Sequence, residues 1–305
     1  MYPAETTTQS IDFYLQHLKS SKNLDDKSIR AYSSDLAQFC EWFTGTGSEY
    51  IDSTIIVMFI EMLQKERRLK DSSIRRKFAS LKSFFRHTYN DTSIFKKVKF
   101  KAERRLPKIL SRREVVRMLK TMKSEISRCP SDFHKTVCIR DNAIIELLFC
   151  TGIRIGELVK ITVTDLDMES RSILIHGKGR KQRVVFISSD QVRDMIISWL
   201  SVRDSLYPMT DHLFLNRYGR NVSIYAIENI FSKYRDLAGV NRKSTPHYLR
   251  HTFATFLVEN GADIREVQEL LGHSSISTTQ IYTEVSVARK KEVLDRFNAR
   301  NKLKI

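Results

Sequence analysis

The chain has 305 residues, 41% hydrophobic and 29% charged, an ordinary composition for a globular protein with enough length for two domains. Lys and Arg number 52 against 35 Asp and Glu, so the formal net charge is +17. This excess indicates a polyanionic partner such as nucleic acid, because each cation at a phosphate releases a counterion. General solubility is the alternative.

Cysteine usage and the first residues bear on location. Cys40, Cys129, Cys138 and Cys150 form no CxxC pair, and His and Cys are not clustered at ligand spacing. Free thiols in a reducing cytosol explain this pattern, and no metal site is predicted. Residues 1–6 lack the features of a signal peptide, and no apolar run is long enough to cross a bilayer. We therefore expect a cytoplasmic protein without a membrane partner.

Apolar residues recur at helical spacing four times in the first 90 residues. The second of these stretches ends at Gly45-Thr46-Gly47, and the fourth begins after Asp71. The predicted helices cover about 11–18, 29–43, 53–66 and 72–86. They predict a helical N-terminal domain over residues 1–90.

The polar face of the fourth predicted helix is positive along its length. A solvated charged face is the ordinary interpretation, but a face of one sign also fits a DNA backbone. Its cations are Arg75, Arg76, Lys77, Lys82 and Arg86.

Helical periodicity fades over residues 91–108, and the segment is basic and reaches a proline at Pro107. We interpret it as an inter-domain linker, whose charge would let it follow a phosphate backbone while two domains clamp a duplex. Its lysines include Lys96, Lys97, Lys99 and Lys101.

A second domain begins near residue 109 with a capping box formed by Ser111 and Glu114. Further on, the apolar pattern changes from the helical period to that of strands, which predicts a small β-sheet among helices. The predicted elements are helices to about 123, over 136–150 and just after Gly152, then strands over 172–175 and 183–187 joined by a glycine-containing turn.

Helical patterns return after residue 190. Thr245 as N-cap and Pro246 at the first helical position begin the helix that carries His247 and Arg250. The predicted helices cover 190–204, 223–237, 246 to near 261, 263–272, about 275–280, and a last amphipathic helix with Val293, Leu294 and Phe297.

Residues suited to phosphate chemistry gather in this second domain. His247 and Arg250 are three residues apart on one helix, so they share a face and can reach the same phosphate. Arg154 follows a glycine turn at a helix start, where backbone amides add to an anion site. A surface salt bridge is the alternative for any one arginine. Fixed cations lower the barrier to phosphoryl transfer by stabilising the charge on the non-bridging oxygens.

Three other residues fit steps of such a reaction. Tyr282 lies between a polar turn and the last helix, where a packing role is the ordinary interpretation. Because the reference pKa of tyrosine is about 10, it attacks phosphorus only with a nearby proton acceptor and cations on the phosphate. His273 can bind phosphate or assist proton transfer. Lys178 in the glycine-rich turn is an ordinary hairpin lysine or a general acid.

The ordered motifs resemble those of the tyrosine site-specific recombinases, the phage integrase family, in the compact Xer-like layout. The resemblance extends from about residue 8 to about 300. It is carried by Thr151-Gly152-x-Arg154-x-x-Glu157-Leu158, Gly177-Lys178-Gly179, His247-x-Leu249-Arg250-His251-Thr252, Leu271-Gly272-His273 and Tyr282-Thr283.

The resemblance implies a mainly α fold with a small β-sheet. A helical, SAM-like core-binding domain over 1–90 and a basic linker over 91–108 would precede a mixed α/β catalytic domain over 109–283. The two domains would form a C-shaped clamp on DNA. The tail over 284–305 would be a C-terminal helix that is passed to a neighbouring subunit, with packing on its own domain as the alternative.

The resemblance also implies roles for individual residues. Tyr282 matches the nucleophile that forms a 3′-phosphotyrosine and releases a 5′-hydroxyl. The matching catalytic positions are Arg154, Lys178, His247, Arg250 and His273, with Glu157 in support of Arg154. Further expected DNA contacts are Arg75, Arg76, Lys77, Lys82, Lys96, Lys97, Lys99, Lys101, Arg180 and Lys181.

The implied partner is double-stranded DNA with specific recombination sites, bound by a homo-tetramer or a hetero-tetramer with a paralogue. Strand exchange would pass through a Holliday junction without a cofactor, metal or ATP. It would serve mobile-element integration and excision or chromosome-dimer resolution. The alternatives are a DNA-binding protein of the same fold that no longer cleaves and a type IB topoisomerase.

Overall fold

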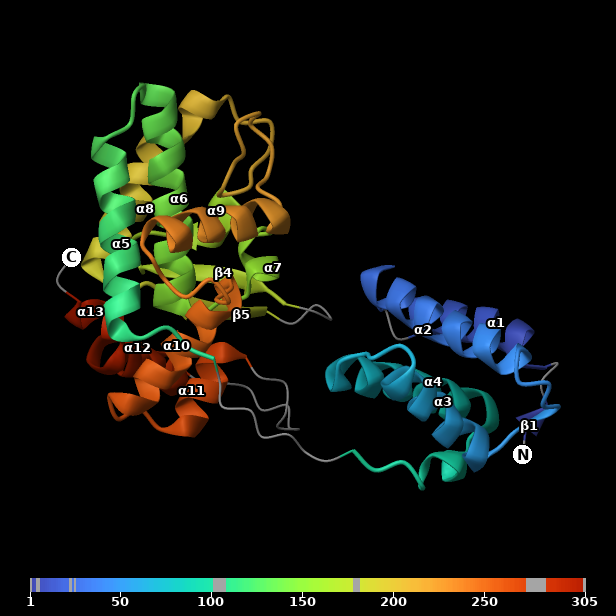
Figure 1. Cartoon of the computed structure of the whole chain (residues 1–305). Coiled ribbons are helices and arrows are strands. Elements are labelled where there is room, and N and C mark those ends of the chain that lie inside the picture. The colour runs from blue at the N-terminus through green and yellow to red at the C-terminus, as the bar shows by residue number, and fades with distance from the viewer. Residues whose placement is uncertain are drawn as a thin grey trace. The chain divides into compact units, whose positions relative to one another are not determined.

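The computed structural model describes residues 2–3, 6–21, 24, 26–100, 108–177, 182–272 and 284–303. The chain divides into two compact units, Met1–Arg105 and Leu106–Ile305 (Figure 1). Among the described residues, every helix is too short or too polar to span a lipid bilayer.

The first unit is mostly helical, and the four predicted helices are confirmed. A short antiparallel pair, β1 (Tyr2–Pro3) with β2 (Tyr50–Ile51), was not expected, because two-residue strands show no alternation in the sequence. The helices are α1 (Thr6–Ser20), α2 (Asp26–Thr44), α3 (Ser53–Lys65) and α4 (Asp71–Tyr89).

Aromatic rings dominate the core of the first unit. Ile94 and Phe95, in the 3₁₀ turn η1 (Ser93–Phe95), are buried in the same core, so this turn packs on the first unit. Burial of large rings supplies much of the apolar area that stabilises a small domain. The most deeply buried rings are Tyr14, Phe39, Phe59, Phe84 and Phe85.

The second unit combines helices with a small sheet, as predicted. The capping box of Ser111 and Glu114 is present, and Thr245 and Pro246 begin a helix as expected. Its helices are α5 (Arg112–Ser127), α6 (Asp132–Thr151), α7 (Ile155–Leu158), α8 (Asp190–Arg203), α9 (Ile224–Leu237), α10 (Pro246–Glu259), α11 (Ile264–Leu271), α12 (Glu284–Phe297) and α13 (Ala299–Lys302), with 3₁₀ turns η2 (Val163–Asp165) and η4 (Asp204–Leu206).

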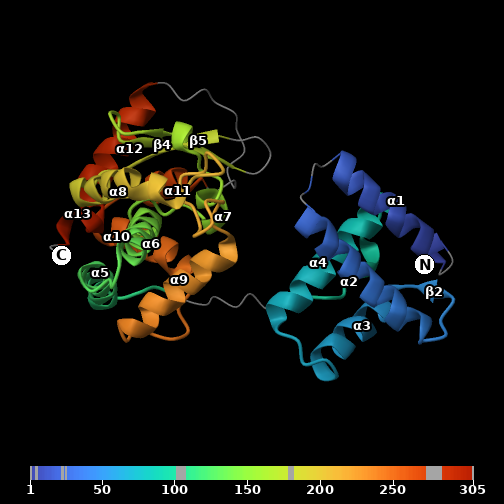
Figure 2. The same ribbon diagram turned by 90° about the horizontal axis from the view of Figure 1, so that it is seen from above.

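Helix α6 is the centre of the second unit. Every residue from Arg140 to Thr151 is buried, because α5, α8, α9 and α10 pack around the helix (Figure 2). A helix enclosed on all sides is apolar around most of its circumference, which agrees with the run Ala143–Phe149, where Glu146 is the one polar residue. Its few buried polar groups therefore need partners inside the protein.

The sheet of the second unit is antiparallel in the order β3 (Leu166–Asp167), β4 (Ser172–His176), β5 (Gln182–Phe186). The two longer strands were predicted, and the two-residue β3 was not. In the register of β4 and β5, Ile173 pairs with Val185 and Ile175 pairs with Arg183. Arg183 thus occupies a strand position whose partner, Ile175, is completely buried.

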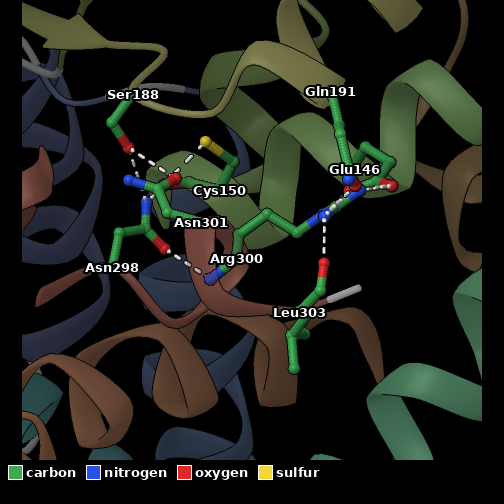
Figure 3. Close-up of polar contacts among 8 residues, drawn as sticks. All are labelled: Glu146, Cys150, Ser188, Gln191, Asn298, Arg300, Asn301 and Leu303. Atoms are coloured by element: carbon green, nitrogen blue, oxygen red, sulfur yellow. Dashed lines mark hydrogen bonds and ion pairs between the residues drawn. The ribbon is translucent and has the colours of Figure 1, made fainter. Parts of the chain in front are cut away.

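The C-terminal residues are anchored on α6 and the segment after β5 (Figure 3). Arg300 donates to both carboxylate oxygens of Glu146, at 2.6 Å each, and both side chains are buried. Asn298 donates to the backbone carbonyl of Cys150 at 2.9 Å. Val293 and Leu294 of α12 are buried in a cluster with residues of α10 and α11 of the same chain.

Candidate active site

The C-terminal end of α6 prepares the position of Arg154. Gly152 ends the helix in the left-handed conformation with φ of +63°, which glycine adopts without strain. A Cβ atom at this position would also overlap the ring of Phe253 from α10. Both the backbone conformation and the lack of space therefore require glycine at position 152. The turn that it forms leads to Arg154, which is the N-cap of α7.

Arg250 lies inside the second unit, with 8% of its surface exposed. Its Nη1 donates to the carbonyl of Gly152 at 2.6 Å, and its Nη2 donates to the carbonyl of Leu271 at 2.7 Å. These bonds tie α10 to the ends of α6 and α11. Burial, followed by the nearby charge of Arg154, lowers the pKa of Arg250 to about 10, so the side chain is still a cation at neutral pH.

Glu157 is a carboxylate shared by two arginines. Arg183 donates Nη1 to Oε1 and Nη2 to Oε2, both at 2.8 Å, while Arg154 donates Nη1 to Oε1 at 3.0 Å. The backbone N–H of Arg154 also donates to Oε2, at 2.9 Å. Burial alone would raise the pKa of Glu157, but the Arg183 bonds and the Arg154 contacts outweigh it and lower the pKa to about 2.

Two arginines, Arg154 and Arg183, thus hold the Glu157 carboxylate, and Arg250 is the third arginine near it. The charges of Arg154, Glu157 and Arg183 all act on the pKa of Arg250, so the four groups form one electrostatic cluster. Three cations and one anion leave a net charge of +2. In a partly buried site such a charge is weakly screened and attracts a phosphate strongly.

Arg183 is the member of this cluster that the sequence did not single out. Its signal was weak, because a charged residue in a strand is the ordinary sign of a solvent-facing position. The register against the buried Ile175 is what turns Arg183 toward Glu157, and only the fold reveals it.

The two histidines near Arg250 lie on α10. His247 is exposed in the first turn of the helix, and His251 is exposed one residue after Arg250. Partial burial, then the charges of His247 and Arg250, lowers the pKa of His251. His247 is therefore exposed three residues before Arg250 on the same helix.

Several predicted site residues lie outside the described residues. The structure therefore gives no position for the expected nucleophile, the hairpin lysine, the second histidine or three of the expected DNA contacts. These residues are Tyr282, Lys178, His273, Lys101, Arg180 and Lys181.

The predicted DNA contacts of the first unit divide into buried and exposed groups. Lys77 is buried and donates Nζ to Asp35 at 2.9 Å, and Arg76 also forms an ion pair with Asp35, so Lys77 is committed to the interior. Arg75 lies over the ring of Phe100, 5.1 Å from its centroid. Lys82 is half-buried, whereas Lys96, Lys97 and Lys99 are exposed.

Within the described ranges, no group of three or more His, Cys, Asp or Glu side chains is placed to hold a metal ion. The four cysteines are free thiols, of which Cys138 and Cys150 are buried. Burial raises the pKa of Cys150 to about 11, so this thiol is protonated at neutral pH.

Comparison with protein families assigns both units. Residues 11–90 match the phage integrase N-terminal SAM-like domain, and residues 108–289 match the phage integrase family. The fold resembles that of the XerH site-specific recombinase bound to difH substrate, with a TM-score of 0.68 over 93% of this chain and 83% of that chain, at 22% identity. The fold is therefore that of a two-domain tyrosine recombinase.

Curated relatives agree with this class. A tyrosine recombinase of Agathobacter rectalis is 36% identical over 93% of this chain and 94% of its own length. Tyrosine recombinase XerC of Thermodesulfovibrio yellowstonii is 35% identical over 97% and 99% of the two chains. The chain belongs to the phage integrase family of tyrosine recombinases, whose reaction is the cleavage and rejoining of DNA strands.

Proposed function

We propose that the protein recombines two specific DNA sites, and that Arg154 and Arg250 hold the phosphate at which each strand is cut. The observation that carries the proposal is the arginine cluster around Glu157, with its net charge of +2, on the catalytic domain of this family. A phosphate is the ligand that such a cluster attracts, since its charge is spread over oxygens that match the guanidinium fork.

In the proposed reaction Tyr282 attacks the scissile phosphorus. A bond forms between Tyr282 Oη and phosphorus, and the bond from phosphorus to the 5′-oxygen breaks. The tyrosine proton passes to a base, for which His247 is the first candidate, and Lys178 donates a proton to the leaving 5′-oxygen. Arg154, Arg250 and His273 would stabilise the charge on the non-bridging oxygens.

The phosphotyrosine ester preserves the energy of the broken bond, so the reverse reaction can rejoin the strand to a new 5′-hydroxyl without ATP. Two such exchanges, one after the other, pass through a Holliday junction. A homo-tetramer, or a hetero-tetramer with a paralogue, would hold the two DNA sites. The reaction would take place in the cytoplasm. Exposed cations of the first unit, Lys96, Lys97 and Lys99, would contact the DNA backbone.

A nicked suicide substrate tests the proposal. Cleavage near the nick releases a short strand and traps the covalent protein–DNA adduct, which a denaturing gel resolves. The wild-type protein is expected to form the adduct, and Tyr282→Phe to form none. An adduct that survives this substitution would exclude Tyr282 as the nucleophile. Relaxation of a supercoiled plasmid that lacks any recombination site would instead indicate a topoisomerase.

Lys178 has its own test. Lys178→Ala is expected to impair cleavage of ordinary DNA, because the 5′-oxygen is a poor leaving group until it is protonated. A substrate with sulfur at the 5′-bridging position should restore cleavage, since sulfur leaves without a proton. Failure of this rescue would contradict the general-acid role of Lys178 and make Lys181 the next candidate.

A further inference from the structure

We propose that Arg183 is a positioning residue that neutralises Glu157, so that Arg154 is free to leave this carboxylate and bind the scissile phosphate. The inference rests on the proposed phosphate-binding role of Arg154. It assigns to Arg183 the task of a permanent counter-ion, while Arg154 is the partner that exchanges between Glu157 and DNA.

The two arginines hold Glu157 unequally. Arg183 makes two parallel hydrogen bonds of 2.8 Å, and its side chain is 19% exposed. Arg154 makes one side-chain bond of 3.0 Å, and its side chain is 41% exposed. A bidentate, shielded pair is stronger than a single, half-exposed contact. The Arg154 contact is therefore the one that a phosphate can replace.

The cost of that exchange depends on Arg183. The Glu157 side chain is only 10% exposed, so an unpaired charge on it would be poorly hydrated. Breaking a shielded ion pair by taking away one partner is strongly unfavourable when nothing else compensates the remaining charge. With Arg183 in place, Glu157 keeps two charge-assisted bonds after the Arg154 side chain departs, and without it Glu157 would retain Arg154.

The backbone keeps its geometry during this exchange. Glu157 also accepts a hydrogen bond from the backbone N–H of Arg154, which is the capping box of α7. That bond does not involve the guanidinium, so the start of α7 stays in place while the side chain turns toward a ligand. The backbone of Arg154 is therefore held by Glu157 while its guanidinium can move.

Arg183 also contacts the end of α11. A Cβ atom at Gly272 would lie 3.0 Å from Cδ of Arg183 and 3.2 Å from its Nε, so the glycine leaves room for the arginine. The carbonyl of Leu271, the preceding residue, accepts the hydrogen bond from Nη2 of Arg250. Arg183 therefore links β5 to α7 and lies against the end of α11. It belongs to the same site as Arg154 and Arg250, the two arginines proposed to bind phosphate.

The test is single-turnover cleavage of the suicide substrate at saturating protein, with DNA affinity measured separately. Arg183→Met is expected to slow cleavage by ~100-fold, which is typical when one group that stabilises the transition state is lost. Adding Glu157→Gln to Arg183→Met should then recover at least ~10-fold of that loss, because a neutral amide no longer retains Arg154. Arg193→Met, which removes one partly exposed charge of α8, is the matched control and should cleave like the wild type.

The pH dependence separates positioning from mere packing. In the wild type, the pKa of Glu157 is about 2, so this group does not titrate above pH 5. Loss of Arg183 raises that pKa, and protonation of Glu157 then releases Arg154. The cleavage rate of Arg183→Met relative to wild type should therefore increase as the pH falls toward 5. A packing residue would give a constant ratio.

Two outcomes decide the inference. Recovery of cleavage in the double variant, with the pH-dependent ratio, supports it. A double variant as slow as Arg183→Met, with the same thermal unfolding midpoint as the wild type, overturns it. If Arg183→Met does not fold, Arg183→Lys takes its place, with Glu157→Gln added in the same way. Loss of the adduct in wild-type protein would instead contradict the proposed function itself.

Discussion

Two buried glutamates of the second unit, Glu146 and Glu157, meet arginines in different ways. Glu146 forms a closed pair with Arg300, in which two bonds of 2.6 Å join side chains that are both almost fully buried (Figure 3). Glu157 is shared by Arg183 and Arg154, and the second of these is 41% exposed. A closed pair fixes a segment, whereas a shared carboxylate leaves one cation available to a ligand.

The two sites lie on adjoining parts of the chain. Glu146 is on α6, and Glu157 is on α7, and only three residues separate the end of α6 from the start of α7. The same helix end also supplies the carbonyl that receives Arg250. The closed pair therefore supports the framework on which the open cluster is built, and substitutions at the two sites should have different consequences.

The largest expected effect is on stability at the closed pair. Arg300→Met leaves Glu146 buried without its partner, so the free energy of unfolding should fall by about 3–5 kcal/mol in urea titrations. Arg183→Met should cost less, because Glu157 retains Arg154. Replacing both partners, with Glu146→Leu and Arg300→Met together, should recover most of the loss. Equal losses for the two single variants would contradict the distinction between the sites.

Acid should weaken the open cluster. The pKa of Glu157 is about 2 in the folded protein, below its ordinary value of 4.5, so its contribution to stability is complete above pH 5 and is lost as the pH falls toward 2. Between pH 6 and pH 3 the wild type should lose about 2 kcal/mol more unfolding free energy than Glu157→Gln. Parallel pH profiles for the two proteins would show that Glu157 is not held as a carboxylate.

A smaller effect is expected at the glycine beside Arg183. Gly272→Ala places a side chain at φ of +63° and against the guanidinium, so stability should fall by about 1–2 kcal/mol and cleavage should slow. Gly239→Ala is the matched control, since its φ is +60° and no atom lies within 4 Å of the added carbon. Gly239→Ala should cost similar backbone strain without slowing cleavage. Equal cleavage rates for both variants would contradict the claim that the space at Gly272 positions Arg183 for cleavage.

The sequence predicted those parts of the molecule that depend on local chemistry. Helix starts such as Ser111 with Glu114, and Thr245 with Pro246, use neighbouring residues, so they are readable without the fold. The places of Arg154 at a helix start and of Arg250 on a helix with His247 were predicted in the same way, and their catalytic role stays a prediction. Each of these signals involves residues that are only a few positions apart in the sequence.

The remaining features depend on contacts between distant residues. Lys77 was expected on a DNA-facing surface but is buried against Asp35, which lies 42 residues earlier. Arg300 meets Glu146 across 154 residues, and Arg183 meets Glu157 across 26. The first pair follows from the packing of α2 on α4, and the other two join α13 to α6 and β5 to α7. No local pattern identifies them.

The central claim is that Arg154 and Arg250 act on the charge of the scissile phosphate. The most direct measurement compares cleavage of ordinary DNA with cleavage of DNA that carries a neutral methylphosphonate at the scissile position. On ordinary DNA, Arg154→Ala and Arg250→Ala should each slow cleavage by ~100-fold or more. On the neutral substrate the penalty should shrink to less than ~10-fold, since little charge then remains to be stabilised. The same penalty on both substrates would contradict the claim.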